Sequence, residues 1–339
     1  MDTPTQIILG AVTAELGFRK KLGRSAVWIA AAAALLPDLD ILARPFISRL
    51  DWMMFHRGPT HSFVFAFAAP ALVAWPFKKY SRSEGSFAWF YACGLAGAVS
   101  HPLLDLCTSY GTGVLWPFTA ERFAWDFIGI VDFIYTGVLA ATLAACAVVR
   151  RRGRLRAAVV IGAAGLALSC AYMGAGALSR HRAAGIARET AAAGGETPVR
   201  SEAYPKIGTI AAWRVVVETD EAFWVGSVNF LNRTPLVLHR LPNAGGHLVE
   251  RAFAHPSAVK FLAFTMGMAR VVIAEEGEGA SVELHDMRYA FPAENPHSMW
   301  ALRLTFPSDG GPAGAEIIEA FEDAGIGEVA VMIWREMWR

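Results

Sequence analysis

The first half of the chain contains a series of apolar segments with the composition of membrane spans, and this feature constrains the fold more than any other. A transmembrane helix needs about 20 mostly apolar residues. In lipid, every backbone polar group has to be satisfied within the spanning structure, which favours helices. We therefore expect about five spans, preceded by a short apolar helix at residues 5–18. The expected spans are residues 25–43, 62–77, 86–108, 127–149 and 157–178.

The composition indicates two different parts. Of the 339 residues, 54% are hydrophobic and 18% are charged, compared with roughly 25% charged in an average soluble protein. The apolar excess lies between residues 7 and 178. We therefore predict a mainly α protein, with a polytopic helical membrane domain at residues 1–178. A linker or juxtamembrane helix at 179–199 then leads to a C-terminal extramembrane α+β domain at 200–339.

Strands are predicted in the C-terminal part where β-branched and aromatic residues gather. We expect an antiparallel sheet, with a helix at residues 257–268 and a further strand at 328–338 that pairs with Trp300–Phe306. The other predicted strands are Trp213–Glu218, Ala222–Phe230 and Val282–Tyr289.

Several classes of protein lack support. The net charge of +1 gives no reason to expect a nucleic-acid partner. The four cysteines lie in apolar segments without C-x-x-C spacing, so no disulfide framework is indicated. Residues 1–4 lack the basic region of a cleaved signal peptide, so we expect the first apolar segment to be retained. The sequence motifs of zincins, serine hydrolases and P-loop nucleotidases are absent.

Three basic clusters fall between alternate apolar segments, and they predict the orientation of the chain. Basic residues near span ends favour the cytoplasmic side, and all three clusters can be cytoplasmic at once. This places the C-terminal domain outside the cytoplasm, on the outer face of the bacterial cytoplasmic (inner) membrane. The clusters are Arg19–Arg24, Lys78–Arg82 and Arg150–Arg156.

Three polar motifs interrupt the apolar half, and in this orientation all of them lie near the outer face. Ionisable groups within membrane segments are costly and are functional candidates by default. Histidine and aspartate are also ligands of divalent metal ions. The motifs are Pro37-Asp38-Leu39-Asp40, His56-Arg57-Gly58-Pro59-Thr60-His61 and Ser100-His101-Pro102-Leu103-Leu104-Asp105.

Two of the motifs allow either a metal site or a structural role. The i,i+4 spacing puts His101 and Asp105 on one helix face, where they can ligate one metal or form a buried pair that stabilises the bundle. The turn predicted at residues 58–59 can bring His56 and His61 inward. The alternative is an interfacial loop that contacts lipid headgroups.

The remaining motif residues have similar alternatives. Asp38 and Asp40 repel one another unless a cation lies between them, although Pro37 also suits a simple helix end. Arg57 suits a phosphate or carboxylate oxygen. The mixture of histidine and aspartate favours zinc, and the number of candidate ligands allows a two-metal site suited to phosphoester hydrolysis.

Other residues are weaker candidates. We expect Asp126 and Asp132 to cap a helix or face water, and Glu15 to pair with Arg19. The aromatic residues of 115–127 are expected to form an interfacial belt. The six histidines of the C-terminal half have no ligand spacing and are expected at the surface.

The motifs, in this order, resemble those of the bacterial membrane-bound metal-dependent hydrolase family (YdjM-like proteins). The resemblance covers roughly residues 1–150. That family is distantly similar to zinc-dependent phospholipase C and P1-type nucleases, which implies clustered zinc ions and phosphoester chemistry. The matching segments are Leu36–Asp40, His56–Ser62, Ser100–Asp105 and Trp116–Phe118.

The chain departs from the family pattern near its start. Where the family usually has a histidine after a threonine, this chain has Thr5-Gln6, although Asp2 is retained. A glutamine carbonyl is a poor zinc ligand. This departure puts one metal ligand, and therefore full activity, in question.

From the residues and the resemblance we predict a metal-dependent hydrolase that cleaves a phosphoester, with a membrane phospholipid as one candidate. The cofactor is expected to be one or more zinc ions, and the partners are the lipid bilayer and a small phosphoester or lipid substrate. Arg57 would steady the substrate's negative charge. The predicted metal ligands are Asp38, Asp40, His56, His61, His101 and Asp105, and the predicted catalytic residues are Asp38, His101 and Arg57.

Two other functions are open. The same carboxylates and imidazoles can serve a transporter as a metal or proton relay, although Glu15 is the only ionisable residue that the sequence offers on the inner half of the spans. Alternatively, the site is catalytically weak or inactive and the outer domain binds a partner, a reading that Gln6 favours.

Overall fold

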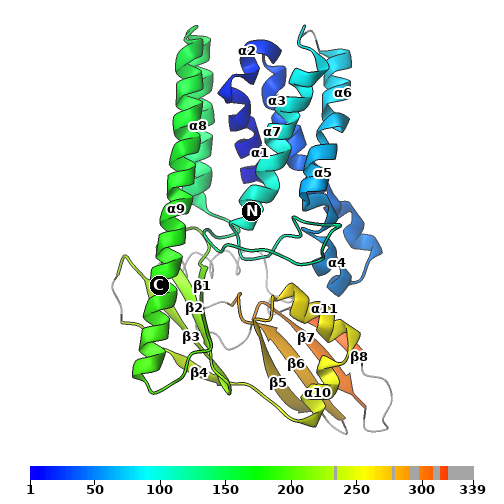
Figure 1. Ribbon diagram of the computed structural model, residues 1–339, viewed down its shortest axis with the longest axis vertical. Coiled ribbons are helices and arrows are strands. Elements are labelled where there is room, and N and C mark those ends of the chain that lie inside the picture. The colour runs from blue at the N-terminus through cyan, green and yellow to red at the C-terminus, as the bar shows by residue number, and fades with distance from the viewer. Residues whose placement is uncertain (82, 233–234, 277–278, 291–297, 308–313, 320–339) are drawn as a thin grey trace. The chain divides into compact units, whose positions relative to one another are not determined.

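The computed structural model divides into two units (Figure 1). The first unit comprises Met1–Ile47 and Phe55–Ala175, and the second comprises Ser48–Met54 and Gly176–Arg339. The structure describes all residues except 82, 233–234, 277–278, 291–297, 308–313 and 320–339.

The first unit is a helical bundle. Its main helices are α1 (Thr3–Thr13), α3 (Ser25–Leu35), α5 (Phe63–Ala68), α6 (Pro70–Tyr80), α7 (Phe87–Leu106) and α8 (Phe133–Arg151). Its short elements are η1 (Ala14–Leu16), α2 (Phe18–Leu22), η2 (Leu36–Phe46) and η3 (Pro59–His61). Helix α9 (Leu155–Ala193) begins in this unit, and α4 (Arg49–Phe55) lies mostly in the second.

The structure contains four or five membrane-spanning candidates among its described residues, where about five were expected. In the described part of the chain, four segments are long and apolar enough to cross a membrane, and a fifth is added if the bent pair Arg49–His61 and Phe63–Tyr80 counts as one span. The two halves of that pair meet at 43°. The four segments are Ser25–Phe46, Phe87–Leu106, Phe133–Arg151 and Leu155–Ala193.

Proline shapes two of these segments. A proline has no N–H and its ring clashes with the preceding turn, so it fits best in the first turn of a helix. The apolar stretch expected as one span at residues 62–77 is accordingly split into α5 and α6, and Pro70 stands in the first turn of α6. Pro37 likewise stands at the start of η2, where α3 gives way to a 3₁₀ helix.

Small residues bring three helices into close contact. A Cβ added at Gly97 of α7 would lie 2.1 Å from the carbonyl oxygen of Ala30 in α3. A Cβ added at Gly10 of α1 would lie 2.6 Å from the Ala34 Cβ and 2.7 Å from the same carbonyl oxygen. Such small residues let helix backbones approach closely where lipid gives no hydrophobic driving force. Helices α1 and α7 therefore both pack closely against α3.

The second unit contains two antiparallel four-stranded sheets, whereas we expected one. The first sheet has the order β1 (Arg200–Pro205), β2 (Ala212–Glu218), β3 (Ala222–Asn229) and β4 (His239–Pro242). The second has the order β5 (Ala269–Glu276), β6 (Gly279–Asp286), β7 (Trp300–Phe306) and β8 (Gly314–Glu319).

Most elements expected in this unit are present. Strands β2, β3, β6 and β7 coincide with or overlap the four predicted strands, and α11 (Pro256–Phe264) lies at the predicted helix. A further helix, α10 (His247–Phe253), precedes it. The partner of β7 is β8, and the strand expected at residues 328–338 lies outside the described residues.

Residues 179–193, expected as a linker or juxtamembrane helix, continue α9 without a break. The cause is the alanine-rich sequence, because alanine is the strongest helix former. Ala183, Ala187 and Ala191 follow one helix face at intervals of four, and all three are buried in a cluster with Trp213 and Val215 of β2. This face packs on the first sheet.

Candidate metal centre

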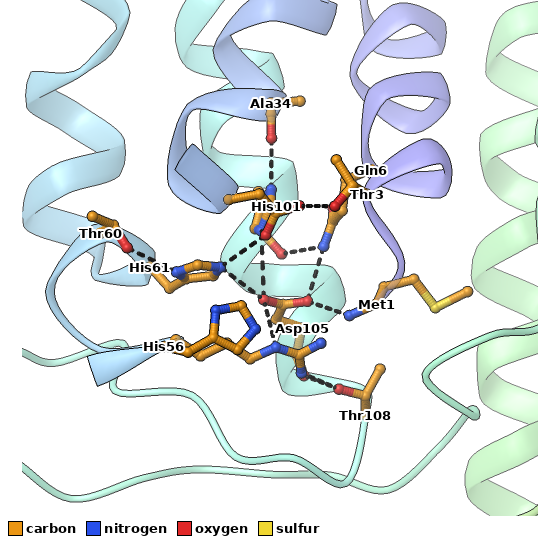
Figure 2. Close-up of polar contacts among 12 residues, drawn as sticks. Met1, Thr3, Gln6, Ala34, His56, Thr60, His61, His101, Asp105 and Thr108 are labelled. Carbon is orange, nitrogen blue, oxygen red and sulfur yellow. Dashed lines mark hydrogen bonds and ion pairs between the residues drawn. The ribbon is translucent and has the colours of Figure 1, made fainter. Parts of the chain in front are cut away.

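All three polar motifs meet at one end of the first unit, beside the N-terminus (Figures 1 and 2). Asp38 from η2, His61 from η3 and His101 from α7 each offer one ligand atom, and these atoms lie within 4.8 Å of one another. Asp40, His56 and His61 form a second group under the same limit. The two groups share His61, so one continuous cluster joins residues from three segments of the chain.

A backbone carbonyl near the end of α3 orients His101. The carbonyl oxygen of Ala34 lies 2.6 Å from His101 Nδ1 (Figure 2). Since a carbonyl oxygen only accepts, Nδ1 is the donor and carries a proton. In the neutral ring the lone pair is therefore on Nε2. Fixing one ring nitrogen by a backbone carbonyl in this way is typical of metal-binding histidines.

The other nitrogen of His101 faces carboxylates. Nε2 lies 3.4 Å from Asp38 Oδ1 and 3.5 Å from Asp105 Oδ2. Nε2 and Asp105 Oδ2 are both buried and have no hydrogen-bond partner. Buried polar atoms are rarely left in this state. A neutral imidazole and a carboxylate both present lone pairs here, so a cation between them would satisfy both.

The two nitrogens of His61 face different carboxylates. Nε2 lies 3.3 Å from Asp38 Oδ1, and Nδ1 lies 3.6 Å from Asp40 Oδ2. His56 Nδ1 is 3.1 Å from both oxygens of Asp40. The rings of His56 and His61 are 5.5 Å apart, as expected from the turn between them. Thr60 supplies a further contact, 3.0 Å from Oγ1 to His61 Nδ1.

Asp105 is held from several sides. Its Oδ1 accepts from Gln6 Nε2 at 2.9 Å and from the Met1 amino group at 2.5 Å (Figure 2). Its Oδ2 lies 3.3 Å from Arg57 Nε and 3.5 Å from His61 Nε2. Asp105 is absent from both compact groups found among the described residues. Asp105 therefore borders the cluster, and its Oδ1 binds the Met1 amine and the Gln6 amide.

Arg57 points into the cluster and is buried. Its φ angle of 59° is in the left-handed region, which non-glycine residues rarely adopt. Its carbonyl accepts from Gly113 N at 2.8 Å, and its Nη1 donates to Thr108 Oγ1 at 2.6 Å. Its guanidinium also lies over the Tyr110 ring, 5.1 Å from the centroid. These contacts with Gly113, Thr108 and Tyr110 hold Arg57 in its strained backbone conformation. Its guanidinium faces Asp105.

Sequence reasoning missed several partners of the cluster. Thr3 donates to Asp38 Oδ2 at 2.6 Å, and Arg122 donates to the His56 carbonyl at 2.9 Å. Neither residue stands in a motif with local spacing. Gln6 was singled out, and it is fully buried with its Oε1 lacking a hydrogen-bond partner. Asp2 stays outside the cluster, because its carboxylate caps α1.

Two secondary expectations are confirmed. Asp132 caps α8 by accepting from Tyr135 N at 2.9 Å, and it is buried rather than water-facing. Glu15 accepts from Arg19 at 2.6 Å, and also from Arg150 at 2.6 Å.

The loop of residues 109–126 borders the cluster and exposes apolar side chains. Phe118 is 84% exposed, and Leu115, Trp116 and Trp125 are also exposed. The loop is held by a bridge between Thr112 and Phe123. Its role as an interfacial belt stays a prediction.

Comparisons with known proteins agree on a membrane family. A family model described as YdjM inner membrane protein matches residues 1–182. Inner membrane protein YbcI of Escherichia coli (strain K12) is 38% identical over 104 residues, which are 30% of this chain and 59% of that relative. The chain thus spans about three fifths of the curated relative's length. No solved structure matches this chain.

Proposed function

The chain belongs to the YdjM inner membrane protein family, and from this premise we propose that it is a metal-dependent hydrolase that acts on a phosphoester at the outer face of the membrane. The family and the apolar helices support the inner membrane as its location. The catalytic part of the proposal is supported by the cluster alone.

One observation carries the proposal: the buried His101 Nε2, which has no hydrogen-bond partner and faces carboxylate oxygens of Asp38 and Asp105 at 3.4 and 3.5 Å. Three carboxylates meet in the cluster, from Asp38, Asp40 and Asp105. The cationic groups that contact these carboxylates in the described ion pairs are the Met1 amine and Arg57. If the imidazoles are neutral, the three negative charges exceed these two positive charges by one. A buried uncompensated charge is strongly unfavourable. The donor set therefore fits a divalent cation.

The residues divide by the group they would serve. Asp38, His61 and His101 would hold one ion. Asp40, His56 and His61 form the alternative group, and because a neutral imidazole has one ring-nitrogen lone pair, His61 would serve one group at a time. Nitrogen and carboxylate oxygen together suit zinc. A bound divalent ion would supply Lewis-acid chemistry toward a phosphoryl group.

The protein's own groups would bind and orient the substrate. Arg57 is fixed by Thr108 and Tyr110 and would attract a phosphate oxygen next to the cluster. Ala34 and Thr60 orient the rings of His101 and His61. The exposed aromatic residues of the 109–126 loop suit a site at headgroup depth. A phospholipid headgroup is therefore the favoured phosphoester.

Metal analysis of the detergent-purified chain, combined with hydrolysis of bis-p-nitrophenyl phosphate, tests the proposal. We expect stoichiometric zinc and slow, metal-dependent cleavage. His101→Ala should lower both the zinc content and the cleavage rate by about tenfold or more, because it removes a ligand. The matched control is His239→Ala, at an exposed position of β4, which should leave both unchanged.

A second candidate is a polar core that only joins helices. It is favoured by the dense contacts of Asp105 with Gln6, Arg57 and the Met1 amine, and it places a second proton on His101 in place of a metal. It predicts purified protein without zinc, and a His101→Ala variant of lower stability. Zinc at stoichiometry without phosphodiesterase activity would also contradict the hydrolase proposal.

A further inference from the structure

A basic cleft lies at the far end of the same helical unit, where α2, α8 and α9 meet. Its volume is about 420 Å³, and four arginines line it together with Ala147 and Leu155. The arginines are Arg19, Arg24, Arg150 and Arg151. Helix α8 runs between this cleft and the metal centre, because Thr136 in its first turn contacts Thr5, the neighbour of Gln6, at 2.6 Å, and Arg150 stands near its other end. At about 1.5 Å per residue these two positions are about 20 Å apart along the helix.

A buried carboxylate fixes two of these arginines. Glu15 has no exposed side-chain surface, and its two oxygens accept from Arg19 Nη1 and Arg150 Nε, each at 2.6 Å. Gly162 of α9 makes room for Glu15, because a Cβ added there would lie 3.0 Å from the Glu15 Cβ. Glu15 therefore binds two of the cleft arginines, and one carboxylate charge does not balance the four guanidinium groups that line the cleft.

Arg150 has an unsatisfied donor. Its side chain is 10% exposed, and Nη2 is buried with no hydrogen-bond partner. A buried unmade hydrogen bond carries the full desolvation penalty of the group. Among the described contacts of the four cleft arginines, the one carboxylate is that of Glu15. The missing partner is therefore an anion with acceptor oxygens.

We propose that this cleft binds the phosphodiester headgroup of an anionic phospholipid. Guanidinium forks match phosphate oxygens in geometry, and basic pockets between spanning helices suit anionic headgroups. The cleft lies at the ends of spanning segments α8 and α9, at the depth of lipid headgroups. Ala147 and the 56% exposed Leu155 give it an apolar side for the start of the acyl chains. A free phosphate ion would use the arginines and leave that apolar side unused.

Lipid retention by the full-length protein in detergent tests this proposal. Native mass spectrometry is run with added phosphatidylglycerol, phosphatidylcholine or inorganic phosphate. The variant is R24Q/R151Q, which removes two exposed cleft arginines and keeps both Glu15 ion pairs. Its control is R152Q/R154Q, which removes the same charge from exposed neighbours that do not line the described cleft.

We expect the wild-type chain to retain phosphatidylglycerol over phosphatidylcholine, with no displacement by inorganic phosphate. R24Q/R151Q should weaken that retention by about tenfold, and the control should weaken it by less than about twofold. Equal losses in both variants would overturn the proposal, because they would indicate surface charge in general. Displacement by inorganic phosphate would overturn the lipid as ligand. Neither outcome depends on zinc or on hydrolysis, so this test is separate from that of the metal centre.

Discussion

Individual residues decide which lone pairs of the metal centre are available. The carbonyl of Ala34 takes the Nδ1 proton of His101, and this leaves Nε2 facing Asp38 and Asp105. A backbone group thus selects the tautomer of this histidine.

Gln6 offers a direct test at this scale. Its Nε2 binds Asp105 and its Oε1 is buried without a hydrogen-bond partner. Gln6→His should raise the zinc content or slow the loss of zinc to a chelator by about tenfold, because imidazole is the better zinc ligand.

Gln6→Asn is the matched control, since it keeps an amide of similar chemistry and should not raise zinc retention. Equal zinc retention in wild-type protein and Gln6→His would mean that position 6 lies out of reach of the metal.

Prediction from sequence succeeded for the convergence of the candidate residues and failed for their supports. Aspartate and histidine in apolar segments are a strong local signal, because burying them needs a reason. Thr3, Thr108 and Arg122 carry no such signal, since they stand in no motif with local spacing and their contacts join segments far apart in sequence. The metal role of the six candidate ligands stays a prediction.

Among the elements, the contact of α3 with α7 positions the centre most directly. Asp38 follows α3 and His101 lies in α7, so any separation of the two helices moves both residues. The close approach depends on Gly97, whose Cβ position is 2.1 Å from the Ala30 carbonyl oxygen.

Gly97→Ala should therefore destabilise the protein by about 1–3 kcal/mol, the usual range for overpacking, and lower its zinc content. A thermal melt in detergent and metal analysis measure the two effects. Gly137→Ala in α8 is the matched control, because an added Cβ there meets nothing within 4 Å. It should be neutral or slightly stabilising. A normal melt for Gly97→Ala would contradict the close packing.

The elements that sequence reasoning missed have weak patterns for physical reasons. Strand β4 has four residues, of which only Leu241 is buried, so little alternation marks it. Strand β1 reads Arg-Ser-Glu-Ala-Tyr-Pro and draws its stability from pairing with β2. The break between α5 and α6 was hidden because apolar residues continue through Pro70.

At the scale of the whole molecule, the helical unit has two chemically different ends. One end carries the aspartate and histidine cluster, and the other carries the arginine-lined cleft. Positive charge near span ends favours the cytoplasm. We therefore expect the metal centre on the outer side.

Labelling with a membrane-impermeant maleimide tests this orientation. In a Cys170→Ala background, which removes the one exposed cysteine, Phe118→Cys should react in intact cells because that loop side chain is 84% exposed. Arg152→Cys is the counterpart at the basic end and should react only after the membrane is permeabilised. The reverse pattern would remove the outer-face part of the proposed function.

The shared imidazole of His61 has one more consequence. Its two nitrogens face different carboxylates, yet they belong to a single conjugated ring. Whatever one nitrogen takes up alters the electron density at the other. The two ligand groups are therefore not independent hosts, and their loading with metal should proceed in two unequal steps, the second weaker than the first.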